Sequence, residues 1–311
     1  LSFSLLFLLA VFLWTYSSHG KVPDNTFLII GAIFGAYMAL NIGANDVANN
    51  VGPAVGARAL TLTGAIIIAA IFESAGAIIA GGDVVNTIKS GIINPNLITD
   101  KNSFIWAMTA GLLAGAVWLN FATSIGAPVS TTHAIVGGVM GAGIASAGFS
   151  ILNWGSLAEI ASSWVISPLL GGIVAAGFLY FIKKQIVYKE NMIEQAQKFV
   201  PILIAIMTWA FTTYLILKGL KQLVNISFLF ASGISLLFAF VAYYIKKKSI
   251  DKNLSNLSND RSSVNKLFTP ALIFGAALLS FAHGANDVSN AIGPLAAIND
   301  AIMHGGTSVK A

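Results

Sequence analysis

The chain carries one polar motif twice, as Gly43-Ala44-Asn45-Asp46-Val47-Ala48-Asn49-Asn50-Val51-Gly52-Pro53 and as Gly284-Ala285-Asn286-Asp287-Val288-Ser289-Asn290-Ala291-Ile292-Gly293-Pro294. Eight of the eleven positions are identical. Both copies end a long apolar run, so a carboxylate and several amides stand where lipid-soluble sequence would otherwise continue. The fold and the function must account for this placement.

Composition identifies the class of protein. Charged residues make up 9% of the 311 residues and apolar residues 56%, whereas about 25% of the residues in an average soluble domain are charged. The mean hydropathy is +0.81, which indicates an integral membrane protein. The absence of cysteine excludes disulfides and thiolate metal sites. The net charge of +5 comes from lysines in a few loops between apolar runs, which is the usual topological bias of membrane proteins and predicts no nucleic-acid partner.

The apolar runs predict membrane-spanning helices, because about 20 helical residues cross the hydrocarbon core. We expect a first helix over 1–16 rather than a signal peptide, since no small-residue cleavage site follows it. Gly126 and Pro128 predict that one helix stops and another restarts there. The further expected helices are 27–42, 59–80, 103–125, 128–149, 157–182, 199–217, 226–245 and 267–282.

The chain divides at a basic stretch, 246–266, whose serines, asparagines and lysines predict a flexible cytoplasmic linker. The expected domains are a first transmembrane helix, a first inverted repeat, a connecting loop with a helix pair, this linker, and the start of a second inverted repeat that we expect to be truncated. Their boundaries are 1–26, 27–182, 183–245, 246–266 and 267–311.

The direction of the two motifs follows from counting crossings from the basic loops, which favour the cytoplasm. With 128–149 counted as one crossing, the helices that carry the two motifs run in opposite directions. If 128–149 is instead a re-entrant hairpin, the count loses one crossing and the predicted inversion fails. The predicted fold class is therefore all-α, a polytopic membrane helix bundle with inverted-topology repeats and broken or re-entrant helices at the midplane. We expect it in the plasma (cell inner) membrane.

The motifs predict a cation site. On a helix, residues three and four apart share a face, and the polar residues that do so are Asn45, Asp46 and Asn49, and likewise Asn286, Asp287 and Asn290. Carboxylate and amide oxygens suit a small hard cation such as sodium better than zinc or copper. We also expect Gly52-Pro53 and Gly293-Pro294 to interrupt their helices and free backbone groups for binding. The alternative is that these residues cap helix ends at the membrane interface.

Two further features predict binding. Pro128-Val129-Ser130-Thr131-Thr132-His133 places hydroxyls on the first turn of a helix, where free N–H groups attract anions; ordinary N-capping is the alternative. Glu73 lies within an apolar run, where a carboxylate costs at least about 2–3 kcal/mol, so it should face the bundle interior. Pairing with Arg58 is the structural alternative.

Nucleotide-loop and zinc-protease motifs are absent from the sequence, so an ion gradient is the visible energy source. An intramembrane enzyme that uses Asp46, Asp287 and Glu73 on a lipid phosphate is a remote alternative, since it does not explain two inverted motifs.

The two motifs, together with Ile71-Phe72-Glu73-Ser74-Ala75-Gly76, 87–93 and 128–133, resemble the inorganic phosphate transporter family. The resemblance implies a sodium- or proton-coupled phosphate symporter with inverted repeats. It implies phosphate binding by Ser130, Thr131, Thr132, Asn45, Asp46, Asn286 and Asp287. It implies sodium binding by Asn45, Asp46, Asn49, Glu73, Asn286, Asp287 and Asn290. The second Pro-x-Ser-Thr-Thr stretch usual in the family does not occur before Ala311.

We therefore expect a secondary transporter that imports inorganic phosphate with sodium, and no enzyme. Proton coupling and sulfate as substrate are the alternatives. The expected partners are inorganic phosphate, sodium and membrane lipid, with a homodimer as a candidate assembly. No cofactor is expected beyond sodium as the coupling ion.

Overall fold

A computed structural model describes residues 2–19, 25–98, 100–219, 226–254 and 257–304. Within these residues the chain is helical, with one isolated bridge between Ile93 and Leu152. The helices are α1 Ser2–His19, α2 Asn25–Gly56, α3 Leu62–Ala80, α4 Gly82–Ser90, α5 Lys101–Ser124, α6 Thr131–Ala147, α7 Trp154–Ile182, α8 Met192–Gly219, α9 Phe228–Asn253 and α10 Arg261–His304. Short turns of helix are η1 Pro95–Leu97, η2 Phe149–Ile151 and η3 Lys183–Val187.

Eight of these helices are long and apolar enough to cross a membrane: α1, α2, α3, α5, α7, α8, α9 and α10, with α7 continuing through η3. The remaining long helix, α6, has 17 residues and rises about 25 Å at 1.5 Å per residue, which is short of the ~30 Å hydrocarbon core. The all-helical membrane bundle expected from the sequence is confirmed.

The described residues fall into two compact units. One unit comprises residues 1–51, 69–162 and 280–311, and the other comprises 52–68 and 163–279. Both polar motifs, apart from Gly52 and Pro53, belong to the first unit. The predicted domain boundaries remain predictions, and residues 305–311 of the expected second repeat lie outside the described part of the chain.

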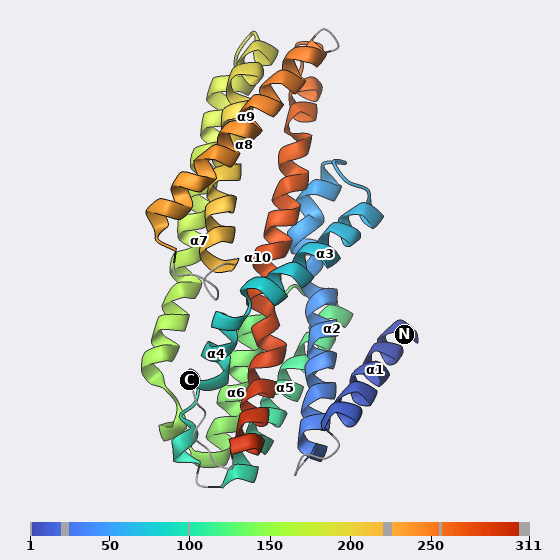
Figure 1. Cartoon of the computed structure of the whole chain (residues 1–311), viewed down its shortest axis with the longest axis vertical. Coiled ribbons are helices and arrows are strands. Elements are labelled where there is room, and N and C mark those ends of the chain that lie inside the picture. Colours follow the sequence, from blue (N-terminus) through green and yellow to red (C-terminus); the bar gives the residue numbers. More distant parts are fainter. Residues whose placement is uncertain (1, 20–24, 99, 220–225, 255–256, 305–311) are drawn as a thin grey trace. The chain divides into compact units, whose positions relative to one another are not determined.

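In the first unit, the helices that carry the two motifs run antiparallel (Figure 1). Near the start of α2, Gly31 faces the side chains of Leu295 and Ile298 on the last turns of α10. Fifteen residues later on α2, Asp46 lies beside His283, which comes earlier on α10. The order of contacts therefore reverses along the pair, and the prediction that the two motifs are inserted in opposite directions is confirmed.

Helices α5 and α6 form an antiparallel hairpin that contributes many of the buried apolar residues of the first unit. Fully buried apolar residues of α5 pack against α6, α2 and α10; they include Phe104, Ile105, Met108, Leu112 and Leu119. The hairpin turns where the sequence predicts a break. Gly126 takes a φ of 70°, which glycine adopts without strain, and Ser130 caps α6 by accepting a hydrogen bond from the His133 N–H at 3.2 Å.

The tip of this hairpin lies beside the first motif. Helix α5 runs parallel to α2, since Phe27 contacts Trp106 near the start of both helices, with ring centroids 5.1 Å apart, and Asn45 bonds Thr123 near the end of α5. Helix α6 then returns along α5.

The expectation that Gly-Pro interrupts each motif is wrong. Helix α2 continues through Pro53 to Gly56, and α10 continues through Pro294 to His304. A proline within a helix removes one hydrogen bond, to the carbonyl four residues earlier, and membrane helices tolerate this loss. The only backbone acceptors that these prolines release are the carbonyls of Asn49 and Asn290.

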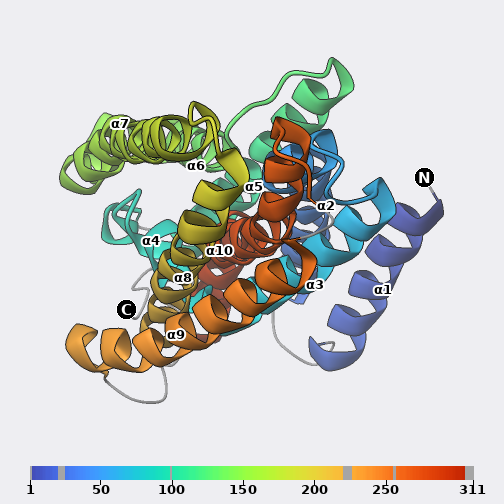
Figure 2. The same ribbon diagram turned by 90° about the horizontal axis from the view of Figure 1, so that it is seen from above.

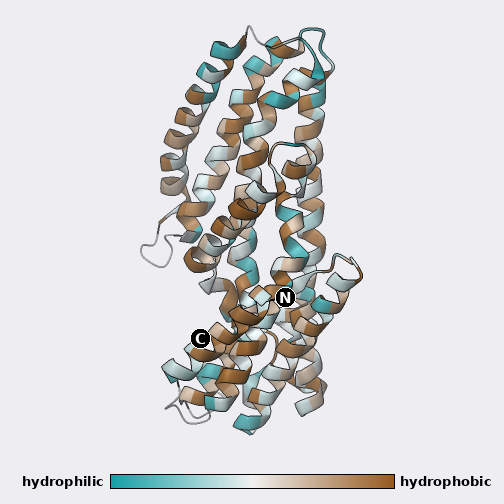
Figure 3. Cartoon of the chain, turned by 90° about the vertical axis from the view of Figure 1, so that its right-hand side faces the viewer, coloured by the Kyte–Doolittle hydropathy of each residue, from teal (hydrophilic) through white to brown (hydrophobic). Residues whose placement is uncertain are grey.

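In the second unit, α8 lies alongside α9, as Figure 2 shows from above. A cluster of buried residues joins η3, α8, α9 and the start of α10; its members are Ile186, Ile193, Ala196, Val200, Ile250, Val264 and Leu267. Hydrophilic residues gather at the helix ends and hydrophobic residues along the helices (Figure 3).

The predicted flexible linker at 246–266 is largely helical. Helix α9 extends through its lysines to Asn253 and α10 begins at Arg261. Asp260 caps α10 by accepting the Ser263 N–H at 2.7 Å. Hydrogen bonds from the Ser258 hydroxyl and from Ser263 lower the pKa of Asp260 below its usual value. The stretch is helical because Ile250 and Val264 bury apolar side chains in the adjoining cluster, which its composition alone does not reveal.

Candidate functional site

Three carboxylates converge on one histidine in the first unit. The His283 Nε2 atom lies 2.9 Å from Asp287 Oδ2 and 3.6 Å from Asp46 Oδ2. The Nδ1 atom of the same ring lies 3.5 Å from Glu73 Oε1. Asp46 is 5% exposed and Asp287 9%, so the two motif carboxylates are largely shielded from solvent. His283 thus joins α2, α3 and α10 at a single point.

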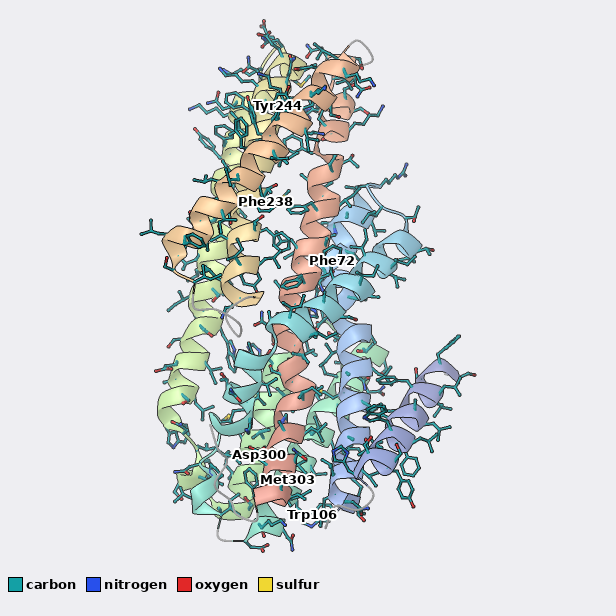
Figure 4. The ribbon with its side chains drawn as sticks, in the orientation of Figure 1. Phe72, Trp106, Phe238, Tyr244, Asp300 and Met303 are labelled. Carbon is teal, nitrogen blue, oxygen red and sulfur yellow. The ribbon has the colours of Figure 1, made fainter. Side chains whose placement is uncertain are left out.

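Close backbone packing brings α3 to this point. Helix α3 crosses α10 near Phe72 (Figure 4), and Gly284 lies directly against the backbone of Glu73, leaving no space for a side chain. The Glu73 carboxylate is held by Asn50, whose Nδ2 donates to Oε1 at 2.8 Å. Glu73 therefore faces the interior of the unit with a motif residue as its partner, as its position in an apolar run predicts.

The start of α6 contacts the second motif. The Thr131 hydroxyl donates to Asp287 Oδ2 at 2.9 Å and accepts from Asn290 Nδ2 at 3.1 Å. Asn290 Nδ2 also lies 3.3 Å from the Thr132 hydroxyl. Asn290 is fully buried and its Oδ1 has no hydrogen-bond partner. The hydroxyls expected to bind an anion thus stand in contact with a carboxylate expected to bind a cation.

Two predicted site residues do not point into this cluster. Asn45 holds the tip of the α5–α6 hairpin, because its amide donates to the Thr123 hydroxyl at 2.9 Å and to the Ala127 carbonyl at 3.4 Å and accepts from the Val129 N–H at 3.3 Å. Asn286 is exposed and donates to the carbonyl of Ala282 on its own helix at 3.1 Å. Their roles as ligands stay predictions.

The remaining predicted residues do meet. Asn49 donates to Asp46 Oδ1 at 3.3 Å. A cavity of about 360 Å³ is lined by Asp46, Asn49, Pro128, Val129, Ser130, Thr131, Thr132, His283 and Asp287. The cavity combines acidic side chains, hydroxyls and a helix N-terminus around one polar space.

A second cavity, of about 660 Å³, approaches the same residues from another side. Apolar side chains of α1, α2, α3 and α10 form most of its wall, and Glu73, His283 and Asp287 supply polar groups. His283 and Asp287 line both cavities. Their 2.9 Å contact therefore lies where a polar cavity and a largely apolar one meet.

His283 is the member of the candidate site that the sequence reasoning missed. Its signal lies in the comparison of the two motifs, since the residue before the glycine is Ile42 in the first copy and His283 in the second. His283 is also four residues before Asp287, which places both on one helix face. A titratable side chain at this position of an apolar run is a functional candidate by default.

In chemical terms, the site offers oxygen ligands for cations next to donors for an oxyanion. The N-terminus of α6 has free N–H groups and a positive dipole end that favour negative charge. The nearby carboxylates oppose that charge as long as they carry no bound cation. The arrangement therefore suits ligands of opposite charge that bind together.

Comparison with known proteins agrees with this chemistry. Residues 42–310 match the model of the phosphate transporter family. A protein of Helicobacter pylori strain J99 named "putative phosphate permease" is 52% identical over 97% of this chain and 57% of its own length. Proteins with the same description from Haemophilus influenzae and Thermococcus kodakarensis are each 38% identical, over 90% and 88% of this chain and 68% and 67% of their own lengths. The chain thus spans little more than half of the Helicobacter relative.

A solved structure described as "The sodium-dependent phosphate transporter" is also similar, with a TM-score of 0.83 and 34% identity over 92% of this chain and 70% of the other. The family and these relatives are transporters and permeases rather than enzymes, and the apolar helices make this an integral membrane protein. The chain belongs to the phosphate transporter family.

Proposed function

We propose that this chain takes part in the import of inorganic phosphate coupled to sodium, with the site around Asp46 and Asp287 as the place of coupling. The observation that carries the proposal is the meeting of two carboxylates from inverted motifs with the hydroxyls at the start of α6. The description of the similar structure as sodium-dependent supports sodium as the coupling ion.

The Thr131–Asp287 hydrogen bond suggests how coupling arises. While Asp287 accepts the Thr131 hydroxyl at 2.9 Å, that donor is occupied by a carboxylate. A sodium ion on Asp287 competes for the same oxygen and frees the hydroxyl to donate to phosphate. Cation binding thus creates the anion site.

Electrostatics acts in the same direction. A unit negative charge about 6 Å from a carboxylate is repelled by about 3 kcal/mol at an effective dielectric constant of ~20. That repulsion weakens phosphate binding roughly a hundredfold for each carboxylate left without a cation. Two sodium ions with divalent phosphate would be neutral, and a third would gain about 2.3 kcal/mol per 100 mV of membrane potential.

The test is uptake of labelled phosphate by the protein in liposomes, driven by a sodium gradient. We expect Asp46→Asn to raise the sodium concentration for half-maximal uptake more than tenfold. Glu159→Gln is the matched control, because Glu159 is a carboxylate of the apolar helix α7 that is exposed and lies outside the cluster. Uptake that is independent of sodium, or equal effects of the two variants, would refute the proposal.

Proton coupling is the second candidate, because His283 places a titratable ring among the three carboxylates. A pH jump without sodium separates it from sodium coupling: uptake driven by the pH jump alone would assign the coupling to protons. Competition by sulfate tests the anion. The plasma membrane, the cytoplasmic side of 246–266, lipid contacts and a homodimer remain predictions.

A further inference from the structure

We infer that Asp46, His283 and Asp287 also form a site for a divalent transition-metal ion, with Zn²⁺ as the ion that fits best. The carboxylate and imidazole donor atoms all lie within 4.8 Å of one another. The oxygen-rich motifs alone favour sodium. The nitrogen of His283 changes the donor set to one that zinc, cobalt and nickel prefer.

The distances between donor atoms are close to those that a zinc ion requires. Bonds of ~2.0–2.1 Å in a tetrahedral arrangement place neighbouring donors about 3.3 Å apart. His283 Nε2 lies 2.9 Å from Asp287 Oδ2 and 3.6 Å from Asp46 Oδ2, so these two pairs need to move by only about 0.3–0.4 Å to match that tetrahedral spacing. Side-chain rotation within one rotamer is enough for such a change. The donor atoms of Asp46 and Asp287 lie within 4.8 Å of each other.

Glu73 provides an independent second observation. A histidine that binds a metal usually directs its other ring nitrogen at a carboxylate, which fixes the ring and strengthens the ligand. The His283 Nδ1 atom has no hydrogen bond and faces Glu73 Oε1 at 3.5 Å, while Asn50 holds Glu73 from the other side. Glu73 is therefore placed to accept a hydrogen bond from Nδ1 when Nε2 of the same ring binds a metal ion.

The fourth position of such an ion is open to a small ligand. The three donor residues line the 360 Å³ cavity together with the hydroxyl residues at the start of α6. Three protein ligands with one open position are typical of reactive rather than purely structural zinc sites. Water fills that position in the absence of another ligand.

Zinc at this site would inhibit transport. It would occupy oxygens that we assign to sodium and would bind α2 to α10 through two carboxylates and one imidazole. This consequence rests on the proposed function, whereas metal binding itself rests only on the geometry.

The experiment measures metal binding directly, on purified protein without a polyhistidine tag, in sodium- and phosphate-free buffer. Equilibrium dialysis with radioactive zinc gives the affinity, and the visible absorption of Co²⁺ reports nitrogen and oxygen ligands in a tetrahedral site. We expect one ion per chain. Mutation of outer partners of zinc ligands typically weakens binding 10–100-fold, so Glu73→Gln should weaken it about tenfold, and loss of a direct ligand in His283→Gln should weaken it about a hundredfold.

His133→Gln is the matched control, because His133 is an exposed histidine at the start of α6 and should leave zinc affinity unchanged. Equal affinity of the His283→Gln variant and the unaltered protein, or equal losses in the His283 and His133 variants, would overturn the inference. Added sodium should weaken zinc binding while magnesium at the same concentration should not. Zinc binding that ignores sodium would preserve the metal site and refute the sodium position, whereas absent zinc binding with intact sodium-driven uptake would refute only the metal site.

Discussion

The two motif glycines, Gly43 and Gly284, stand at equivalent positions of the repeat but in opposite surroundings. A Cβ atom on Gly284 would collide with the carbonyl and Cα of Glu73, whereas a Cβ on Gly43 would meet no atom within 4 Å. Both glycines line the larger cavity, so the contrast between them lies in the packing of Gly284 against α3. Alanine at the two positions should therefore have opposite consequences for the free energy of unfolding.

The magnitude follows from two terms. Alanine is favoured over glycine inside a helix by about 1 kcal/mol, and this gain applies equally to both positions. Overpacking costs about 1–3 kcal/mol, and it applies only at Gly284. Because the obstacle there is backbone rather than a flexible side chain, we expect the upper part of that range and a difference of about 2–3 kcal/mol between the variants.

The assay is the apparent melting temperature of both variants in detergent at one scan rate. At ~2–4 °C per kcal/mol for a unit of this size, Gly284→Ala should melt roughly 4–12 °C below Gly43→Ala. Gly284→Ala should also reduce sodium-driven uptake, because Glu73 and His283 are displaced together with the backbones that carry them. Equal melting temperatures would show that α3 and α10 do not pack at this distance.

Two further predictions concern hydrogen bonds. Thr131→Val leaves Asp287 and Asn290 without the hydroxyl that both contact and should destabilise the protein by about 1–3 kcal/mol. Thr132→Val removes only a 3.3 Å bond and should destabilise it less. A lower melting temperature for Thr132→Val than for Thr131→Val would contradict these hydrogen-bond assignments. The Asp260 cap should make the start of α10 sensitive to acid, because the pKa of Asp260 is lowered in the folded protein. The stabilisation that the ionised carboxylate gives is complete above the pKa of Asp260 in the unfolded chain. It is lost as the pH falls through the lowered pKa of the folded protein. Hydrogen exchange of the first turn of α10 should therefore accelerate in acid, and Asp260→Asn should exchange faster at neutral pH and respond less to acid.

Much of the fold follows from hydropathy and from the positions of glycine and proline. The apolar runs place the starts of most long helices to within three residues, but α2 and α10 continue 14 and 22 residues past the expected ends at 42 and 282. Gly126 with Pro128 locates the hairpin turn. Pro53 and Pro294 led to a wrong prediction of helix breaks. Whether a proline ends a helix depends on the residues that follow it. In both motifs apolar residues continue beyond the proline, so the helix continues and loses one hydrogen bond.

The sequence predicts most residues of the candidate site, but not His283 and not the contacts that each residue makes. Spacing shows that Asp46 and Asn49 share a helix face, yet it cannot show that Asn45 bonds the hairpin tip, because that requires knowledge of what lies opposite. The roles of Asn290 and Asn286 differ for the same reason, since one meets Thr131 and the other faces outward. His283 is not apparent from the residues that the two motifs share, because it stands at a position where the two copies differ.

That difference bears on the direction of transport. If the two repeats were chemically identical, exchanging their conformations would convert an inward-facing carrier into an outward-facing one of equal energy, and neither orientation would be preferred at rest. Ile42 and His283 occupy equivalent positions, but only His283 contacts the carboxylates of both motifs. If the chain alternates between two orientations as the proposed function requires, this imidazole contributes to the energy difference between them, and His283→Ile should bring the two orientations closer in energy.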